Sequence, residues 1–168
     1  DITGGLTGID TLLSNNGTLN GENSDSTWTL NATPTYVTGG NTLNFSGFTT
    51  LNGGTADDTF DVNAVAFASA VTIDGGTETS ADTLNFDAGG LSVASTATML
   101  AAGSTLVTFS NIENVNVTNA AATFTITGTA ADDTLTIAHD NTNVTYQLNT
   151  DPAVAVPAGV SLVFNAED

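Results

Sequence analysis

The sequence has no lysine and no arginine, and its 18 Asp and Glu residues give the 168-residue chain a formal net charge of −18. Because no cation is present to neutralise phosphate, nucleic-acid binding is excluded as a function class. Attraction to an anionic membrane surface is disfavoured for the same reason. Salt bridges from Lys or Arg are impossible, so stability must come from apolar burial, backbone hydrogen bonds and any bound cations.

Cysteine is absent as well, which excludes disulfides and thiolate metal ligands. No apolar run is long enough to cross a bilayer, so we expect no membrane insertion. The sequence also lacks an initiator methionine and the basic and apolar segments of a signal peptide. We therefore expect a chain that begins after processing or inside a longer protein.

Catalytic side chains are scarce. His139 is the only histidine, and no Ser-His-Asp grouping can be inferred. The pairs Asp57-Asp58 and Asp132-Asp133 resemble glycosidase carboxylates in composition only, because neighbours in one strand point to opposite faces and cannot act on one substrate. The sequence predicts that the protein is not an enzyme, with a polysaccharide-acting enzyme as the remote alternative.

What the sequence does contain is a recurring glycine turn followed by an alternating strand. Residues 51–62 run Leu-Asn-Gly-Gly-Thr-Ala-Asp-Asp-Thr-Phe-Asp-Val. Asn-Gly and Gly-Gly favour turns, because glycine reaches positive φ without steric cost. The alternation of apolar and polar residues that follows is typical of a half-buried strand. Residues 126–137 nearly repeat this run, and looser copies occupy residues 2–12, 19–30, 37–45 and 73–86.

The spacing of these repeat units predicts how they pack. Their glycines recur about every 14 to 22 residues, a period typical of solenoids. Each unit is too small to bury its own apolar face, so neighbouring units must stack to make a core. We predict an all-β chain: a parallel β-solenoid of roughly nine coils, forming one repeat domain over residues 1–168. An antiparallel β-sandwich is the alternative fold.

Three further features of the chain bear on this fold. Residues 95–102 tolerate either a short helix, with Gly103 as its C-terminal cap, or a strand. Trp28 is interpreted as a core aromatic in preference to a sugar-binding platform. Phe164-Asn165 matches Leu51-Asn52, so the pattern stops where another turn would begin. We therefore expect this chain to be a segment of a longer repeat array.

These segments resemble the haemolysin-type (RTX-like) Gly/Asp-rich repeats and the β-helical repeats of very large secreted bacterial surface proteins. Residues 52–60 fit the nonapeptide Gly-Gly-x-Gly-x-Asp-x-apolar-x with Ala56 in place of the third glycine, and residues 128–135 fit it with two glycines replaced. Residues 109–115 are similar to a connector often found beside such repeats. The nonapeptides here are isolated, one per unit, instead of consecutive.

In that family consecutive copies bind calcium between facing turns. Stacked units would also bring like charges together, since neighbouring strands lie about 4.8 Å apart and carboxylates at that distance repel by about 1 kcal/mol in water. Calcium with oxygen ligands would relieve this repulsion. Alternatively, each aspartate caps its own turn by accepting backbone N–H groups, without metal. The acids expected to stack are Asp10, Asp25, Asp58, Asp82 and Asp133. The candidate calcium ligands are Asp57, Asp58, Asp82, Asp132 and Asp133.

The resemblance and the repeats together indicate a structural role. We expect a β-solenoid segment of a secreted bacterial cell-surface protein, an adhesin stalk or extracellular filament, that joins copies of itself or flanking repeats end to end. A self-assembling fibre or surface-coat subunit is the alternative. Cell-surface glycans are a further candidate partner, and the expected location is extracellular or on the cell surface.

Overall fold

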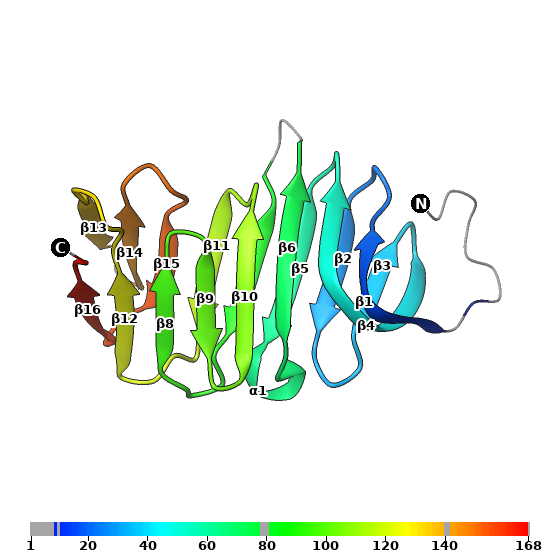
Figure 1. Ribbon diagram of the computed structural model, residues 1–168, viewed down its shortest axis with the longest axis horizontal. Helices are drawn as coiled ribbons and strands as arrows, with labels where there is room; N and C mark the ends of the chain where they lie inside the picture. The colour runs from blue at the N-terminus through cyan, green and yellow to red at the C-terminus, as the bar shows by residue number, and fades with distance from the viewer. Residues whose placement is uncertain (1–8, 10, 78–80, 140–141, 168) are drawn as a thin grey trace.

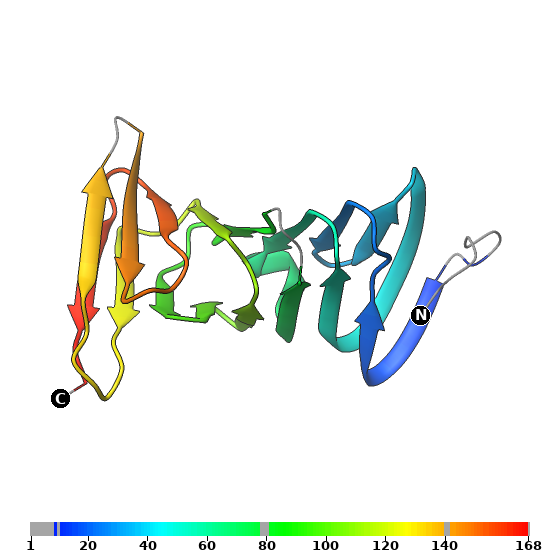
Figure 2. The ribbon, with the colours of Figure 1, turned by 90° about the horizontal axis from the view of Figure 1, so that it is seen from above.

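The computed structural model describes residue 9 and residues 11–77, 81–139 and 142–167. The protein is all-β: sixteen strands belong to one continuous hydrogen-bonded sheet, and the described residues contain one helix, α1 (Ala64–Phe67). Figures 1 and 2 show the strands side by side along the long axis, with β1 near one end and β13 and β16 near the other. No helix among the described residues could span a membrane.

The sheet folds into two layers that face each other. Along the first layer the strands follow one another in the order β1 (Thr11–Asn20), β4 (Asn41–Gly54), β6 (Ala70–Gly76), β10 (Thr105–Ser110), β9 (Met99–Ala102), β8 (Val93–Thr96), β12 (Thr123–Thr127) and β16 (Ser161–Asn165). Every neighbouring pair in this layer is parallel except β10–β9 and β9–β8.

The second layer has the same mixed character. Its order is β2 (Ser26–Leu30), β5 (Asp58–Asn63), β7 (Thr83–Asp87), β11 (Asn114–Thr118), β15 (Val154–Pro157), β14 (Asn143–Leu148) and β13 (Leu135–His139). The pairs from β2 to β15 are parallel, whereas β15–β14 and β14–β13 are antiparallel. β3 (Thr35–Thr38) pairs antiparallel with both β2 and β4 and so joins the two layers.

The sequence repeat sets the register in the parallel regions. Phe60 of β5 lies opposite Leu84 of β7 on one side and opposite Trp28 of β2 on the other. In the other layer Leu51 lies between Leu19 and Ile73. The prediction that equivalent strands lie side by side and parallel is therefore confirmed for the units at residues 19–30, 51–62 and 73–86.

The core lies between the layers and consists of columns of buried side chains. One column runs through five strands of the second layer: Trp28, Phe60, Leu84, Val115 and Val154. The rings of Trp28 and Phe60 stack with their centroids 5.6 Å apart. Trp28 is fully buried, so its interpretation as a core aromatic is confirmed and a sugar-binding platform is wrong.

The sheet is mixed, whereas a parallel stack was predicted.

The short helix that was one option over residues 95–102 is wrong. These residues form the end of β8, a turn and β9, and Gly103, at φ 59°, belongs to the tight turn into β10. Leu100 and Ala102 are buried while their neighbours are partly exposed, a period of two. The short helix lies instead at residues 64–67, where Asn63 caps it by accepting the N–H of Ala66 at 2.9 Å.

The unit at residues 126–137 does not stack as the others do. Its first strand, β12, has parallel neighbours, but β13 pairs antiparallel with β14. Strand β14 is held across the core by Tyr146, whose hydroxyl bonds Ser95 Oγ of β8 at 2.6 Å. The sheet therefore combines parallel stacked units with antiparallel pairs around β3, around β9 and around β14. The parallel β-solenoid is confirmed only as an all-β fold with stretches of parallel pairing.

Candidate functional site

The glycines of the repeat lie against the aspartates of the repeat. A Cβ added to Gly53 would come within 3.0 Å of Asp58 Oδ2, one added to Gly75 equally near Asp82 Oδ2, and one added to Gly128 equally near Asp133 Oδ2. None of these three glycines has the positive φ that demands glycine. These positions therefore need glycine, because the carboxylate of the same unit fills the space that a side chain would take, and at Gly53 and Gly75 a carbonyl oxygen of the neighbouring unit fills it as well.

Four polar residues at equivalent positions of the second layer form a hydrogen-bonded column, which we call the acid ladder: Ser26, Asp58, Asp82 and Glu113. The Ser26 hydroxyl donates to Asp58 Oδ1. The backbone N–H of Asp58 donates to Asp82 Oδ1 at 2.7 Å, and that of Asp82 donates to Glu113 Oε2 at 2.8 Å. Asp82 and Glu113 thus each accept a main-chain N–H of the neighbouring unit.

The acid ladder brings together only two of the aspartates that were expected to stack. Asp58 and Asp82 are buried in it, whereas Asp25 is exposed and precedes the ladder residue Ser26. Asp133 lies in the loop before β13, which pairs antiparallel with β14, and Asp10 falls outside the described residues. The candidate calcium ligands Asp57 and Asp132 are exposed.

Two ladder members, Ser26 and Glu113, were missed by the sequence analysis. Aligning Ser-Thr-Trp at residues 26–28 with Asp-Thr-Phe at residues 58–60 would have placed Ser26 in the aspartate position. Glu113 precedes Asn114, which pairs with Thr83, so the same alignment puts it opposite Asp82. The signal is a shared position in the unit, which serine and glutamate can occupy as well as aspartate.

Asp133 caps its own turn, as the metal-free alternative predicts. It accepts the Thr129 N–H at 2.8 Å, the Thr129 hydroxyl at 3.0 Å and the Asn149 amide at 2.9 Å. The hydrogen bond from Asn149 contributes most to holding the pKa of Asp133 below its usual range, followed by the Thr129 backbone bond. Asn149 lies in the turn directly after β14, so this bond also ties the hairpin to the Gly128 turn.

Amide side chains form two more columns along the outside of the stack. In the second layer Asn85 donates to Asp61 at 2.8 Å and Asn116 donates to Asn85 at 3.0 Å. In the first layer Asn52 donates to Asn20 at 2.6 Å, and Asn111 donates to Asp74 at 2.7 Å. Because each bond joins one unit to the next, these residues stabilise stacking itself.

Calcium binding stays a prediction, and two carboxylate oxygens of the acid ladder already accept backbone hydrogen bonds. Within the described ranges no three acidic or histidine side chains gather as metal ligands. Calcium needs six to eight oxygen ligands, whereas Asp82 Oδ1 and Glu113 Oε2 each receive a backbone N–H. The contacts described for the ladder are hydrogen bonds.

We therefore expect the melting temperature to be the same, within about 1 °C, in excess calcium and in excess chelator. Asp82→Asn is the control, because it keeps the Oδ1 acceptor for Asp58 while removing the charge. Calorimetry with both proteins in both buffers makes the measurement. A calcium-dependent rise of several degrees that Asp82→Asn abolishes would contradict the metal-free account and place calcium at the ladder.

Comparison of the chain with protein-family models, with curated proteins and with solved structures finds no match.

Proposed function

We propose that this chain is a non-enzymatic structural unit: a β-solenoid segment of a secreted bacterial cell-surface protein, an adhesin stalk or extracellular filament. The observation that carries the proposal is that equivalent positions of successive units lie in parallel register. Buried columns, the acid ladder and the amide columns all run along the same axis. A stack of this kind is a stiff rod in which each unit is stable only between neighbours.

The ends of the stack support joining to further units. In the part of the chain that the structure describes, β16 pairs only with β12, β13 only with β14, and β1 only with β4. Open strand edges can pair with another chain. At the β16 and β13 end apolar side chains are exposed as well: Val163 by 39%, Phe164 by 37% and Ile137 by 56%. Flanking repeats or a further copy would cover both the edges and these side chains.

The charge of the chain favours end-to-end over lateral association. The chain has 18 Asp and Glu residues and no Lys or Arg, so the sides of two copies repel each other. Within the first layer the edge strand β16 itself, Ser161–Asn165, carries no charged residue. Growth along the axis is therefore the direction in which apolar contact and backbone pairing outweigh repulsion. The alternative, a self-assembling fibre or coat subunit, would use the same ends between identical copies.

A tandem protein of two copies in one chain tests this proposal. We expect it to melt at least about 4 °C above the single chain, because the second copy covers the apolar end of the first. Small-angle scattering should show a rod of about twice the length. The matched control is the same tandem protein with Phe164→Lys in the first copy, since a charge on an edge strand blocks pairing.

If scattering shows two separately moving copies and the melting temperature is unchanged, end-to-end stacking is contradicted. Electron microscopy of the single chain separates the proposal from its alternative. A stalk segment gives short rods at all concentrations, whereas filaments grown from the single chain alone would favour the self-assembling fibre.

A further inference from the structure

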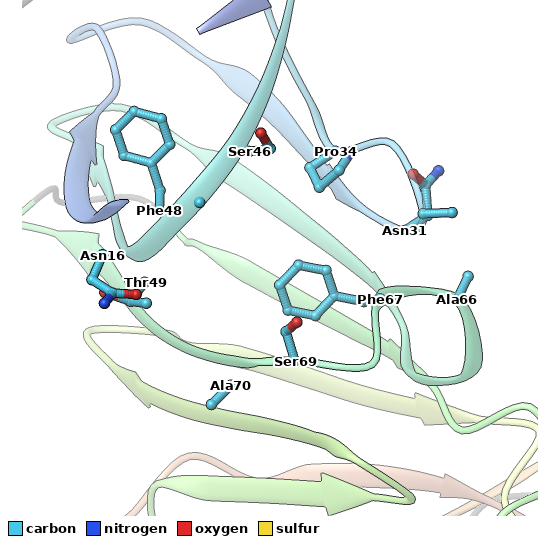
Figure 3. A pocket seen from close by; sticks show the side chains of 12 residues that line it. Asn16, Asn31, Pro34, Ser46, Phe48, Thr49, Ala66, Phe67, Ser69 and Ala70 are labelled. Carbon is cyan, nitrogen blue, oxygen red and sulfur yellow. The ribbon is translucent and has the colours of Figure 1, made fainter. Parts of the chain in front are cut away.

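A cleft opens beside α1, away from the acid ladder and from the ends of the stack. Its volume is about 620 Å³, within the range of about 300–1,000 Å³ that is typical of small-ligand sites. Figure 3 shows it between the bend of β4, the loop after β2 and the segment that carries α1. We call it the α1 cleft.

Two aromatic rings line the α1 cleft, and both are held in place. Phe48 comes from β4 and Phe67 from the end of α1, and each is partly buried against the core. The ring of Phe48 packs edge-on against buried Phe45, with the centroids 6.1 Å apart. Figure 3 places the two rings on different sides of the opening. A flat apolar group that enters the cleft would therefore meet fixed rings.

The remaining lining is polar but uncharged. Asn16 and Asn31 contribute amides, and Ser46, Thr49 and Ser69 contribute hydroxyls. None of the twelve lining residues is acidic or basic, although the chain as a whole has 18 acids. The cleft thus combines aromatic surface with neutral hydrogen-bonding groups, and it lies on a protein that repels anions.

The backbone around the cleft adopts conformations that the chain otherwise reserves for asparagine and glycine. Ala68, between the lining residues Phe67 and Ser69, has φ 50°, and the other four described non-glycine residues with positive φ are asparagines, Asn16 of the cleft among them. Such a conformation costs an alanine about 1 kcal/mol or more and is concentrated at functional sites. On the opposite wall Gly47 has φ 74°, and a Cβ there would overlap the carbonyl oxygen of Ser14.

We propose that the α1 cleft binds a neutral saccharide unit of a glycan. A pyranose has an apolar face that packs on aromatic rings and a rim of hydroxyl groups that amides and serine hydroxyls can bond. Acidic sugars are disfavoured, because the chain has no cation to pair with them. This site goes beyond the structural role proposed above, since a rod with such clefts would itself adhere to glycans.

The test is a titration of the ¹⁵N-labelled chain with cellotetraose, chitotetraose and mannotetraose, each up to about 10 mM, which detects even millimolar affinity. We expect at least one of them to shift the amide signals of Asn16, Gly47 and Ser69 in a saturable way, while tetragalacturonate shifts none. The proposal is overturned if no neutral tetrasaccharide gives saturable shifts, or if the shifts lie outside the cleft. Binding of tetragalacturonate with equal affinity would also overturn it.

Matched substitutions on α1 separate a cleft effect from a loss of structure. Phe67→Leu keeps apolar bulk but removes the ring, and we expect about a tenfold or greater loss of affinity. Val65→Ala changes an exposed residue of the same helix that does not line the cleft, and should leave affinity unchanged. An unchanged affinity in Phe67→Leu, or equal losses in both, would refute the site. Neither variant changes the ends of the stack. The melting temperature of the tandem protein therefore tests the structural role independently of this site.

Discussion

Gly75→Ala is expected to lower the free energy of unfolding by about 3 kcal/mol or more. The new Cβ would come within 3.0 Å of the Asn111 carbonyl oxygen and of the Asp82 carboxylate. Neither group can move cheaply, because the first is backbone and the second is buried in the acid ladder, where it holds the Asp58 N–H. Equilibrium urea unfolding at 25 °C provides the measurement.

The other glycines of the chain supply a graded series of controls. Gly53→Ala should be nearly as costly, since its Cβ would overlap the Gly75 carbonyl oxygen and Asp58. Gly128→Ala should cost less, because the overlapping group is the carboxylate of Asp133 near the surface. A Cβ at Gly90 would have no atom within 4 Å, so Gly90→Ala should cost only the strain of an alanine at a φ of 83°, about 1 kcal/mol. A loss in Gly90→Ala equal to that in Gly75→Ala would show that stacking does not impose the repeat glycine.

Trp28→Ala should be the most damaging change of a core side chain, at about 3–5 kcal/mol. Its ring is fully buried and contacts Phe60, Tyr36 and Phe45, with centroids 5.6, 4.3 and 5.9 Å away. Because Tyr36 and Phe45 come from β3 and β4, the substitution would open a cavity where the two layers are joined. Chemical denaturation measures the loss.

Trp28→Phe is the matched control for that substitution. It keeps an aromatic ring on Phe60 and should lose less than half as much stability as Trp28→Ala. The indole Nε1 has no hydrogen-bond partner in the described structure, so removing it leaves no donor or acceptor unsatisfied. Equal losses in the two variants would mean that an aromatic ring at this position adds no stability through its contacts with Phe60, Tyr36 and Phe45.

The parallel part of the fold could be predicted because the repeat carries its own register. In Thr-Phe-Asp-Val and Thr-Leu-Asn-Phe the apolar residues occupy the same alternate positions, and a shift of one residue would expose all of them. The close approach of glycine and aspartate could not be predicted in this way, because Asp58 and Asp133 follow their glycines by five residues and Asp82 follows Gly75 by seven. The position of Asp58 next to Asp82 followed from this register.

The antiparallel parts could not be predicted from local sequence. Residues 99–102, Met-Leu-Ala-Ala, have no strong strand preference, and it is pairing with β8 and β10 that makes them a strand. Residues 132–135 read almost like residues 57–60, yet Leu135 pairs antiparallel with Leu148. The antiparallel pairing of β13 depends on the position of β14. Tyr146 of β14 is hydrogen-bonded to Ser95, which lies far away in the sequence.

The α1 cleft was also beyond sequence analysis. Phe48 and Phe67 lie in different units, and neither belongs to the repeat pattern. Their approach depends on the bend of β4 at Gly47 and on the turn at Ala68, whose positive φ cannot be read from an alanine. The helical turn α1, which the Asn63 cap begins, belongs to no repeat unit either.

Pairs of introduced cysteines test the parallel stacking of repeat units most directly, because the chain has no cysteine of its own. Thr59 lies directly opposite Thr83, at the strand spacing of about 4.8 Å, which a disulfide can span. We expect Thr59→Cys with Thr83→Cys to form an intramolecular disulfide on mild oxidation. Thr59→Cys with Asp87→Cys should not, because Asp87 pairs with Asn63, four residues further along. Antiparallel pairing of the same two strands predicts the reverse, so a disulfide between positions 59 and 87 but not 59 and 83 would contradict the account.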